Sequence, residues 1–334
     1  MSRKLIVMMK PSKFQTSKES KAPCPYMRGL DKNLRSVCGQ GFFQNHPYGW
    51  ETKYYNGPRA IEAVQTIGKV KGNRKQNGIM KWVTVKPGEN SPCDSTKTAV
   101  GHMAASLIAQ QLNETPDSVF IFPTGNTPKP MYEALRSMPG LNWRQAKLFH
   151  LDEYVQKPEL GLSQEQTFKN YLNKELWEAN PAISQARRYY LQDYLHNPKG
   201  YEDKIKAVGH PDVVVLGIGG NGHIAFIEPG FDPKVASHIH TVHLAEKTLN
   251  DNFPNRKSPQ NPNGEGYSDE AVTLGLETIL SARHIILLAT GNNKKAILKK
   301  AFGDFSEPPT PEVPASYLKM HPNVTVITDV TLND

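Results

Sequence analysis

A three-layer α/β/α Rossmann-like domain with a mostly parallel sheet is the fold class that this sequence predicts. Short runs of apolar residues alternate with segments of helical periodicity. The connections between successive runs are a dozen residues or longer, as crossovers between parallel strands require. Loops rich in glycine, hydroxyl and carboxylate residues follow several of the runs. Ligands of such sheets bind outside the carboxyl ends of the strands, so these loops are the candidate functional positions.

The first half of the sheet is expected to begin after residue 80. Residues 96–113 predict a helix, because their apolar residues recur at helical spacing (Val100, Met103, Ala104, Leu107, Ile108 and Leu112). The continuous apolar run at 119–122 predicts a short buried strand, and a helix is expected from Met131 to Met138. Residues 147–151 predict the next strand, which runs into an acidic pair.

The second half follows the same alternation. Helices are expected near 166–178 and 200–207, before a strand at 213–216 that consists of three valines and a leucine. The remaining expected elements are a helix near 270–281, a strand at 285–289, a helix at 294–302 and a last strand at 324–327.

Positive charge is concentrated in the N-terminal quarter. Residues 1–80 hold 15 Lys/Arg against 4 Asp/Glu, whereas the whole chain has a net charge of only +8. The remainder is therefore slightly acidic, which argues against a nucleic-acid-binding function for the whole protein. A weak affinity of the basic segment for polyanions stays open.

The predicted domain organisation has two parts. Residues 1–80 show no sustained helical or strand pattern, so they are expected to form a poorly ordered or loosely docked extension, and 81–334 the catalytic domain. A targeting segment, or a translation start at Met80, are the alternatives for the extension. The three cysteines are widely spaced, which favours a reducing, cytoplasmic location. No run of 18 apolar residues is present, so no transmembrane helix is expected.

The most informative segment is 217–229, Gly-Ile-Gly-Gly-Asn-Gly-His-Ile-Ala-Phe-Ile-Glu-Pro. Its four glycines permit a sharp turn at the tip of the 213–216 strand and a close approach to a ligand. His223 and Glu228 arrive at the same tip, where an imidazole that titrates near neutrality can exchange protons. A structural turn with an incidental histidine is the alternative interpretation of this segment taken alone.

Three further loops carry polar groups at strand ends. Thr124, Gly125, Asn126 and Thr127 precede a helix, and hydroxyls beside a helix N-terminus suit a phosphate. In the pair Asp152 and Glu153, one carboxylate can face the ligand while the other points away; alternatively, both serve a helix dipole. Lys294 follows Gly291 at a helix start on the same edge and can neutralise an anion.

Three histidines have a spacing that could be taken for a metal site. His238, His240 and His243 have a spacing that occurs in zinc sites, since residues two apart share a strand face. No Cys or acidic ligand stands beside them in the sequence. Half-exposed strand histidines are therefore the favoured interpretation, and no metal is expected.

Together the loops resemble the glucosamine-6-phosphate deaminase (isomerase) family, over about residues 96–330. The segments that carry the resemblance are Pro123 to Pro128, Leu151 to Val155, Gly217 to Pro229, Thr273 to Leu280, Gly291 to Lys294 and His321-Pro322 with the final strand. The resemblance implies conversion of glucosamine 6-phosphate to fructose 6-phosphate and ammonia by an isomerase/deaminase of the hydrolase class. It implies no redox cofactor and no metal.

The resemblance also assigns roles. Asp152 is the expected base between C2 and C1, His223 the ring-opening acid/base, and Glu228 the group that orients the imidazole. Asn221 joins this catalytic set. The expected substrate-binding residues are Thr124, Gly125, Asn126, Thr127, Lys294, Gly219 and Gly222, of which Thr124, Gly125, Thr127 and Lys294 hold the phosphate.

The chain departs from the family pattern at several positions. Asn221 stands where some members carry Asp, and Ile227 where Asn is usual. Asn252 aligns with an expected phosphate-binding Arg, for which Arg256 or Lys257 is a candidate substitute. His240 and Val242 align with basic residues of an allosteric site, so that regulation is not expected here, and a homo-oligomer is left open.

Two other functions remain as alternatives. A 6-phosphogluconolactonase shares the fold, but it usually has Arg after the Asp-Glu pair, where this chain has Tyr154, and a different run after the histidine. A non-catalytic sugar-phosphate-binding homologue is the second alternative, supported by Asn252 and Ile227. In every case the expected partner is a small sugar phosphate.

Overall fold

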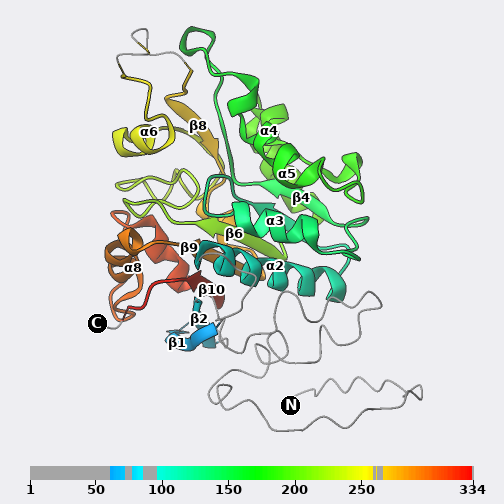
Figure 1. Cartoon of the computed structure of the whole chain (residues 1–334). Helices are drawn as coiled ribbons and strands as arrows, with labels where there is room; N and C mark the ends of the chain where they lie inside the picture. The colour runs from blue at the N-terminus through cyan, green and yellow to red at the C-terminus, as the bar shows by residue number, and fades with distance from the viewer. Residues whose placement is uncertain (1–60, 72–76, 86–95, 259–260, 262–265, 333–334) are drawn as a thin grey trace, which may run out of the picture.

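The computed structural model describes residues 61–71, 77–85, 96–258, 261 and 266–332. These residues form a central sheet of seven strands covered on both faces, with a small three-stranded sheet beside it (Figure 1). The three-layer α/β/α prediction is confirmed.

The central sheet is parallel except at one edge. In spatial order its strands are β1 (Ile61–Lys71), β2 (Asn77–Val85), β10 (Asn323–Thr328), β9 (His284–Ala289), β6 (Val213–Gly217), β3 (Val119–Phe122) and β4 (Lys147–His150). Only the pairing of β1 with β2 is antiparallel. The small sheet is antiparallel, in the order β5 (Asp152–Tyr154), β8 (Glu270–Thr273) and β7 (His240–His243).

Seven α-helices connect the strands in the described part of the chain. They are α2 (Thr96–Glu114), α3 (Lys129–Ser137), α4 (Phe168–Leu172), α5 (Pro198–Val208), α6 (Glu246–Asn252), α7 (Leu276–Leu280) and α8 (Lys295–Phe302). A π-helical turn, Asn173–Trp177, continues α4. Short 3₁₀ helices occupy Pro158–Leu160, Gln164–Gln166, Gln185–Arg187, Leu191–Tyr194, Asn292–Lys294 and Pro314–Met320. Among these helices none has the combination of length and apolar composition needed to span a bilayer.

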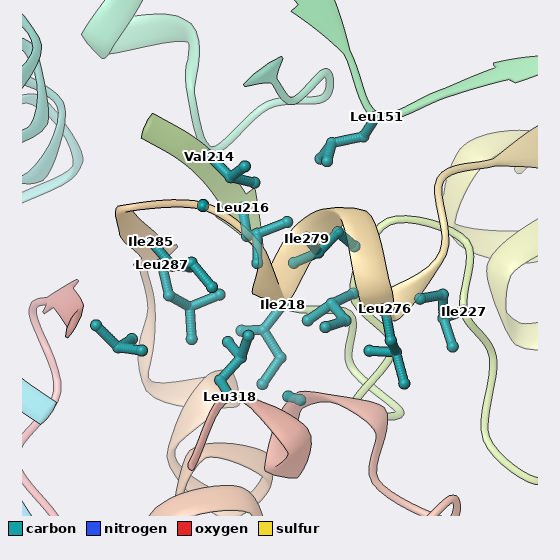
Figure 2. Packing of buried hydrophobic residues seen from close by; sticks show 14 of the residues in the cluster. Leu151, Val214, Leu216, Ile218, Ile227, Leu276, Ile279, Ile285, Leu287 and Leu318 are labelled. Atoms are coloured by element: carbon teal, nitrogen blue, oxygen red, sulfur yellow. The ribbon is translucent and has the colours of Figure 1, made fainter. Parts of the chain in front are cut away.

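Alternation along the strands produces two apolar cores. Ile285 and Leu287 of β9 pack on one face of the sheet with residues of α5, α7 and α8. Ile286 and Leu288 point to the other face and pack with α2 and α3. This period of two is what a sheet buried on both faces requires. Figure 2 shows the first core, in which Val214 and Leu216 of β6 lie beside the α7 residues.

Four neighbouring strands deliver the polar loops to one edge. The order β9, β6, β3, β4 places the carboxyl ends of these parallel strands side by side. The chain passes from β3 outward to β4 and then returns to β6 on the other side of β3. A crevice opens at such a reversal, and ligands bind there in open α/β sheets.

The predicted elements match the structure closely, with one error of type. The helix expected near 270–281 is a helix only from Leu276; Glu270–Thr273 is strand β8, which pairs with β5 and β7. Residues 270–273 are Glu-Ala-Val-Thr, a run too short to show either period clearly. Two antiparallel partners decide its conformation, since tertiary pairing overrides weak local preference.

Two strands fall at the end of the segment expected to be an extension, where the sequence shows no sustained strand pattern. Strand β1 lies within it, and β2 crosses the expected domain boundary, with Met80 fully buried and paired with Val324 of β10. Residues 1–60, the bulk of the expected extension, lie outside the described residues.

Candidate active site

The four polar loops surround one cavity of about 560 Å³. Eight of the predicted site residues line it: Thr124, Gly125, Asn126, Thr127, Asp152, Gly219, His223 and Lys294. The other three, Asn221, Gly222 and Glu228, lie behind His223 and support it. Segments as far apart in the chain as 124 and 294 therefore meet at one place.

The loop before α3 is held by two tyrosines from outside it. The Tyr171 hydroxyl donates to the carbonyl of Gly125 at 2.6 Å, and the Tyr132 hydroxyl donates to that of Pro123 at 2.5 Å. Gly125 has φ +99°, a value that side chains disfavour, so glycine is needed at this turn. The loop leads directly into the N-terminus of α3, where peptide dipoles favour an anion.

The adjacent carboxylates Asp152 and Glu153 have different tasks. Glu153 is fully buried and accepts hydrogen bonds from the backbone N–H groups of Tyr154, Phe168 and Lys169, which ties it to the start of α4. Burial raises the pKa of Glu153 to about 7, although these N–H groups act in the opposite direction. The sequence left open whether these carboxylates face the ligand or serve a helix N-terminus. In the structure Glu153 binds the start of the helix, whereas Asp152 lines the cavity.

Asp152 is a buried carboxylic acid in the cavity wall. The residue is 6% exposed. Burial, and to a smaller extent the charge of Glu153, raises the pKa of the Asp152 carboxyl group well above its usual value. The preceding strand residue His150 holds its backbone: His150 Nδ1 lies 2.9 Å from the Asp152 carbonyl oxygen, so this nitrogen carries the proton. His150 Nε2 accepts from the Leu191 N–H at 2.8 Å.

The glycines after β6 let the His223 ring lie against the backbone. The Gly222 N–H donates to the Gly219 carbonyl at 3.0 Å, and the Gly219 N–H donates to the His223 carbonyl at 2.9 Å, which closes a tight turn. A Cβ atom on Gly219 would come within 2.4 Å of the imidazole. Gly222 has φ +96°. These two positions are where the turn requires glycine.

A polar cluster behind His223 fixes its orientation. The Glu228 carboxylate lies 3.5 Å from His223 Nδ1, and it accepts hydrogen bonds from Asn221 Nδ2 at 2.8 Å and from Thr248 Oγ1 at 2.5 Å. Burial alone would raise the pKa of Glu228, but His223, Thr248 and Asn221 together lower it. Glu228 is therefore ionised beside the imidazole. Thr248, on α6, had no signal in the sequence.

Lys294 reaches the cavity from the turn after β9. Its ammonium group donates to the carbonyl of Ile218 at 2.7 Å. Burial lowers the pKa of Lys294, while the charge of Asp251 acts in the opposite direction and that of Lys247 in the same direction. The ammonium group has three donors and the Ile218 carbonyl takes one of them, so the others remain available for an anion in the cavity.

Hydrophobic anchors stand next to the site residues in the chain. Leu151, Ile218 and Ile227 lie in the same buried cluster, and Figure 2 shows them around the α7 residues Leu276 and Ile279. Ile227, where the resemblance led us to expect Asn, is fully buried in this cluster. The substitution therefore adds to the core behind Glu228.

An aromatic group covers the side of the cavity near α6. Tyr154 packs against Phe168, Phe226 and Phe253 with ring centroids 4.5–5.6 Å apart, and its hydroxyl accepts from Asn252 Nδ2 at 3.0 Å. All five side chains line the cavity. Sequence patterns did not identify this wall, because its members come from four separate segments.

The basic residues proposed as substitutes for the missing Arg lie elsewhere. Arg256 and Lys257 both contact the Glu246 carboxylate, at 2.7 and 2.8 Å, and neither lines the cavity. This expectation was wrong, because an acidic residue on α6 takes up both charges.

The three spaced histidines are engaged separately. His238 lies near Glu202 and Glu277, at 3.5 and 3.3 Å, and His243 near Glu270 at 3.2 Å. His240 Nδ1 faces the carbonyl of His238 at 2.9 Å. Within the described residues, no group of His, Cys, Asp and Glu is arranged to hold a metal ion.

Comparison with known proteins identifies the same family that the sequence motifs resemble. The family model described as glucosamine-6-phosphate isomerases/6-phosphogluconolactonase matches residues 93–327. A glucosamine-6-phosphate deaminase of Geobacillus sp. (strain WCH70) is 36% identical over 68% of this chain and 87% of its own length. One from Staphylococcus epidermidis is 35% identical over 71% of this chain and 94% of its own.

Solved structures give the same architecture. A monomeric glucosamine-6-phosphate deaminase superposes with a TM-score of 0.59 at 28% identity, covering 70% of this chain and 93% of its own. A 6-phosphogluconolactonase from Trypanosoma cruzi reaches 0.53 at 21% identity, covering 70% and 91%, which is a likeness of fold alone.

Proposed function

Because the chain belongs to the glucosamine-6-phosphate isomerase/6-phosphogluconolactonase family, we propose that it converts glucosamine 6-phosphate and water to fructose 6-phosphate and ammonia. The observation that carries this proposal is that Asp152, His223 and Lys294 line one cavity. A base, an oriented acid/base and a cation are the three groups that the reaction needs within reach of one substrate.

His223 opens the sugar ring in this proposal. Its imidazole accepts the proton of the C1 hydroxyl and returns a proton to the ring oxygen, which breaks the bond from C1 to that oxygen. The ionised Glu228 carboxylate, 3.5 Å from Nδ1, stabilises the imidazolium that forms in between. The other ring nitrogen, Nε2, is then the atom that faces the substrate.

Asp152 moves a proton from C2 to C1 of the open sugar. The carboxylate removes the C2 proton of the open-chain ammonium aldehyde, while the ammonium group gives one proton to the C1 oxygen, which yields a neutral enolamine. The same carboxylic acid then protonates C1, which leaves an iminium at C2 and a hydroxyl on C1. Water adds to that carbon, and ammonia leaves. One water is consumed for each ammonia released, so the net change is a hydrolysis although the first half is an isomerisation. The raised pKa makes Asp152 a stronger base than an exposed aspartate.

The anionic end of the substrate is held away from the reacting carbons. Thr124, Gly125 and Thr127 in the loop before α3, with Lys294, bind the phosphate in this proposal. Binding energy from this remote group positions C1 and C2 against the acid/base groups, which raises the rate as well as the affinity.

The direct test is to incubate the purified protein with glucosamine 6-phosphate and to measure ammonia and fructose 6-phosphate together. His223→Gln is expected to slow turnover by about 10²–10⁴-fold, whereas exposed His196→Gln leaves it unchanged. Hydrolysis of 6-phosphogluconolactone in place of deamination would support the lactonase alternative. A thermal shift with sugar phosphates and no product would support a binding protein.

A further inference from the structure

Two lysine side chains line the cavity among the described residues, Lys294 and Lys129. The first was identified from the sequence; the second was not. Lys129 is the first residue of α3 and is separated from the loop of Thr124 to Thr127 only by Pro128, the N-cap of the helix. Its side chain is half-buried.

The charge of Lys129 has no acidic partner in the described part of the chain. Its ammonium group lies over the ring of Tyr171, 6.0 Å from the ring centroid. By contrast, Lys247 on α6 and Arg256 after it are neutralised: Lys247 pairs with Asp251 at 2.9 Å, and Arg256 with Glu246. An unpaired charge on a cavity wall, held by an aromatic ring, remains available to a bound anion.

The aromatic support of Lys129 belongs to the anion-binding loop. The Tyr171 hydroxyl bonds the carbonyl of Gly125, and its ring packs edge-on against Tyr132, which in turn bonds the carbonyl of Pro123. The same two tyrosines therefore fix the loop backbone and place the ammonium group beside it.

Charge balance calls for a second cation. A phosphate monoester carries about −1.5 to −2 charges at pH 7. Lys294 contributes one positive charge, and one of its donors is already bonded to the Ile218 carbonyl. We infer that Lys129 supplies the second positive charge to the anionic group of the substrate, so that its charge sets the preference for phosphorylated over neutral sugars. This inference rests on the proposed function for the identity of the anion.

Lys129→Met is the test variant, because methionine retains the apolar stem over Tyr171 and removes the charge. The matched control is Lys204→Met: Lys204 is also half-buried and lies over a tyrosine, 5.2 Å from the Tyr189 ring centroid, but does not line the cavity. The probe is inorganic phosphate, titrated calorimetrically at fixed ionic strength. Lys129→Met is expected to weaken phosphate binding about tenfold, and Lys204→Met to leave it unchanged.

Kinetics provide an independent readout. For glucosamine 6-phosphate, Lys129→Met is expected to raise KM about tenfold with kcat within about twofold, and Lys129→Arg to restore KM. Failure of the wild type to release ammonia would overturn the proposed function only, because the phosphate titration still tests Lys129. Unchanged phosphate affinity in Lys129→Met, or equal losses in both Met variants, would overturn the inference. Lys129→Gln serves as the second charge-free variant if Lys129→Met does not fold.

Discussion

Two sets of residues around the cavity are built in different ways. The residues that we propose for proton transfer (Asp152, His223 and Glu228, the proton-transfer set) are tied down at many points: Glu228 alone has three polar partners, and each member stands beside or close to a core residue. The lysines that we propose for anion binding (Lys129 and Lys294, the anion set) are long side chains, held by one ring and one carbonyl respectively.

The difference follows from the physics of the two tasks. A proton transfer requires donor and acceptor atoms within hydrogen-bond distance, and a displacement of 1 Å can cost about 10²-fold in rate. A charge acts over a longer range and tolerates movement. Changes in the proton-transfer set should therefore lower kcat, whereas changes in the anion set should raise KM.

Gly219→Ala is expected to have the largest of these effects. The added Cβ would lie 2.4 Å from the His223 ring, so the imidazole must move, and kcat should fall about 10²-fold. Gly217→Ala is the matched control, because a Cβ there meets nothing within 4 Å. Steady-state kinetics of both variants check the prediction, and equal kcat values would contradict it.

Lys294→Met tests the anion set. Loss of a charge-assisted hydrogen bond should raise KM for glucosamine 6-phosphate about 30-fold, with a much smaller change in kcat. Lys300→Met, an exposed lysine on α8, is the control. A fall in kcat at constant KM would place Lys294 in the proton-transfer set and break the distinction.

Glu228→Gln tests whether the charge of the polar cluster acts through His223. The amide keeps the size of the side chain but removes the charge beside His223, so kcat should fall about tenfold. In the His223→Gln background the same change should have almost no further effect, because both residues act as one unit. Additive losses in this double-mutant cycle would contradict the assignment; exposed Glu312→Gln is the control.

Ile227→Asn should affect stability far more than activity. The residue is fully buried, so an amide there should lower the free energy of unfolding by about 3 kcal/mol. Ile227→Val should lower it by about 1 kcal/mol. Denaturant titration of both variants checks this; a stable Ile227→Asn variant with altered kcat would show that position 227 serves the cavity.

The sequence predicted those features that local pattern encodes. Apolar runs and glycine-bearing loops specified the strands at 119–122 and 213–216, and the convergence of their loops followed from parallel topology. Strand β8 and the first strand, β1, escaped prediction, because their conformation depends on pairing with distant segments.

Side-chain roles were harder to predict than positions. Nothing in the pair Asp152 and Glu153 indicates which carboxylate faces the cavity; the three N–H groups that bind Glu153 decide it. Thr248 and Lys129 lie outside the motif that each serves. Their positions beside His223 and the cavity depend on the tertiary fold, so no local sequence pattern could indicate them.

The central claim is that a buried carboxylate, Asp152, is the base, and Asp152→Asn tests it most directly. Its folded-state pKa is raised, so the folded protein binds more protons than the unfolded chain, and stability falls as pH rises through that range. At pH 8 Asp152→Asn is therefore expected to raise Tm while ammonia release falls about 10³-fold or more. Turnover near the wild-type rate in this folded variant would contradict the account.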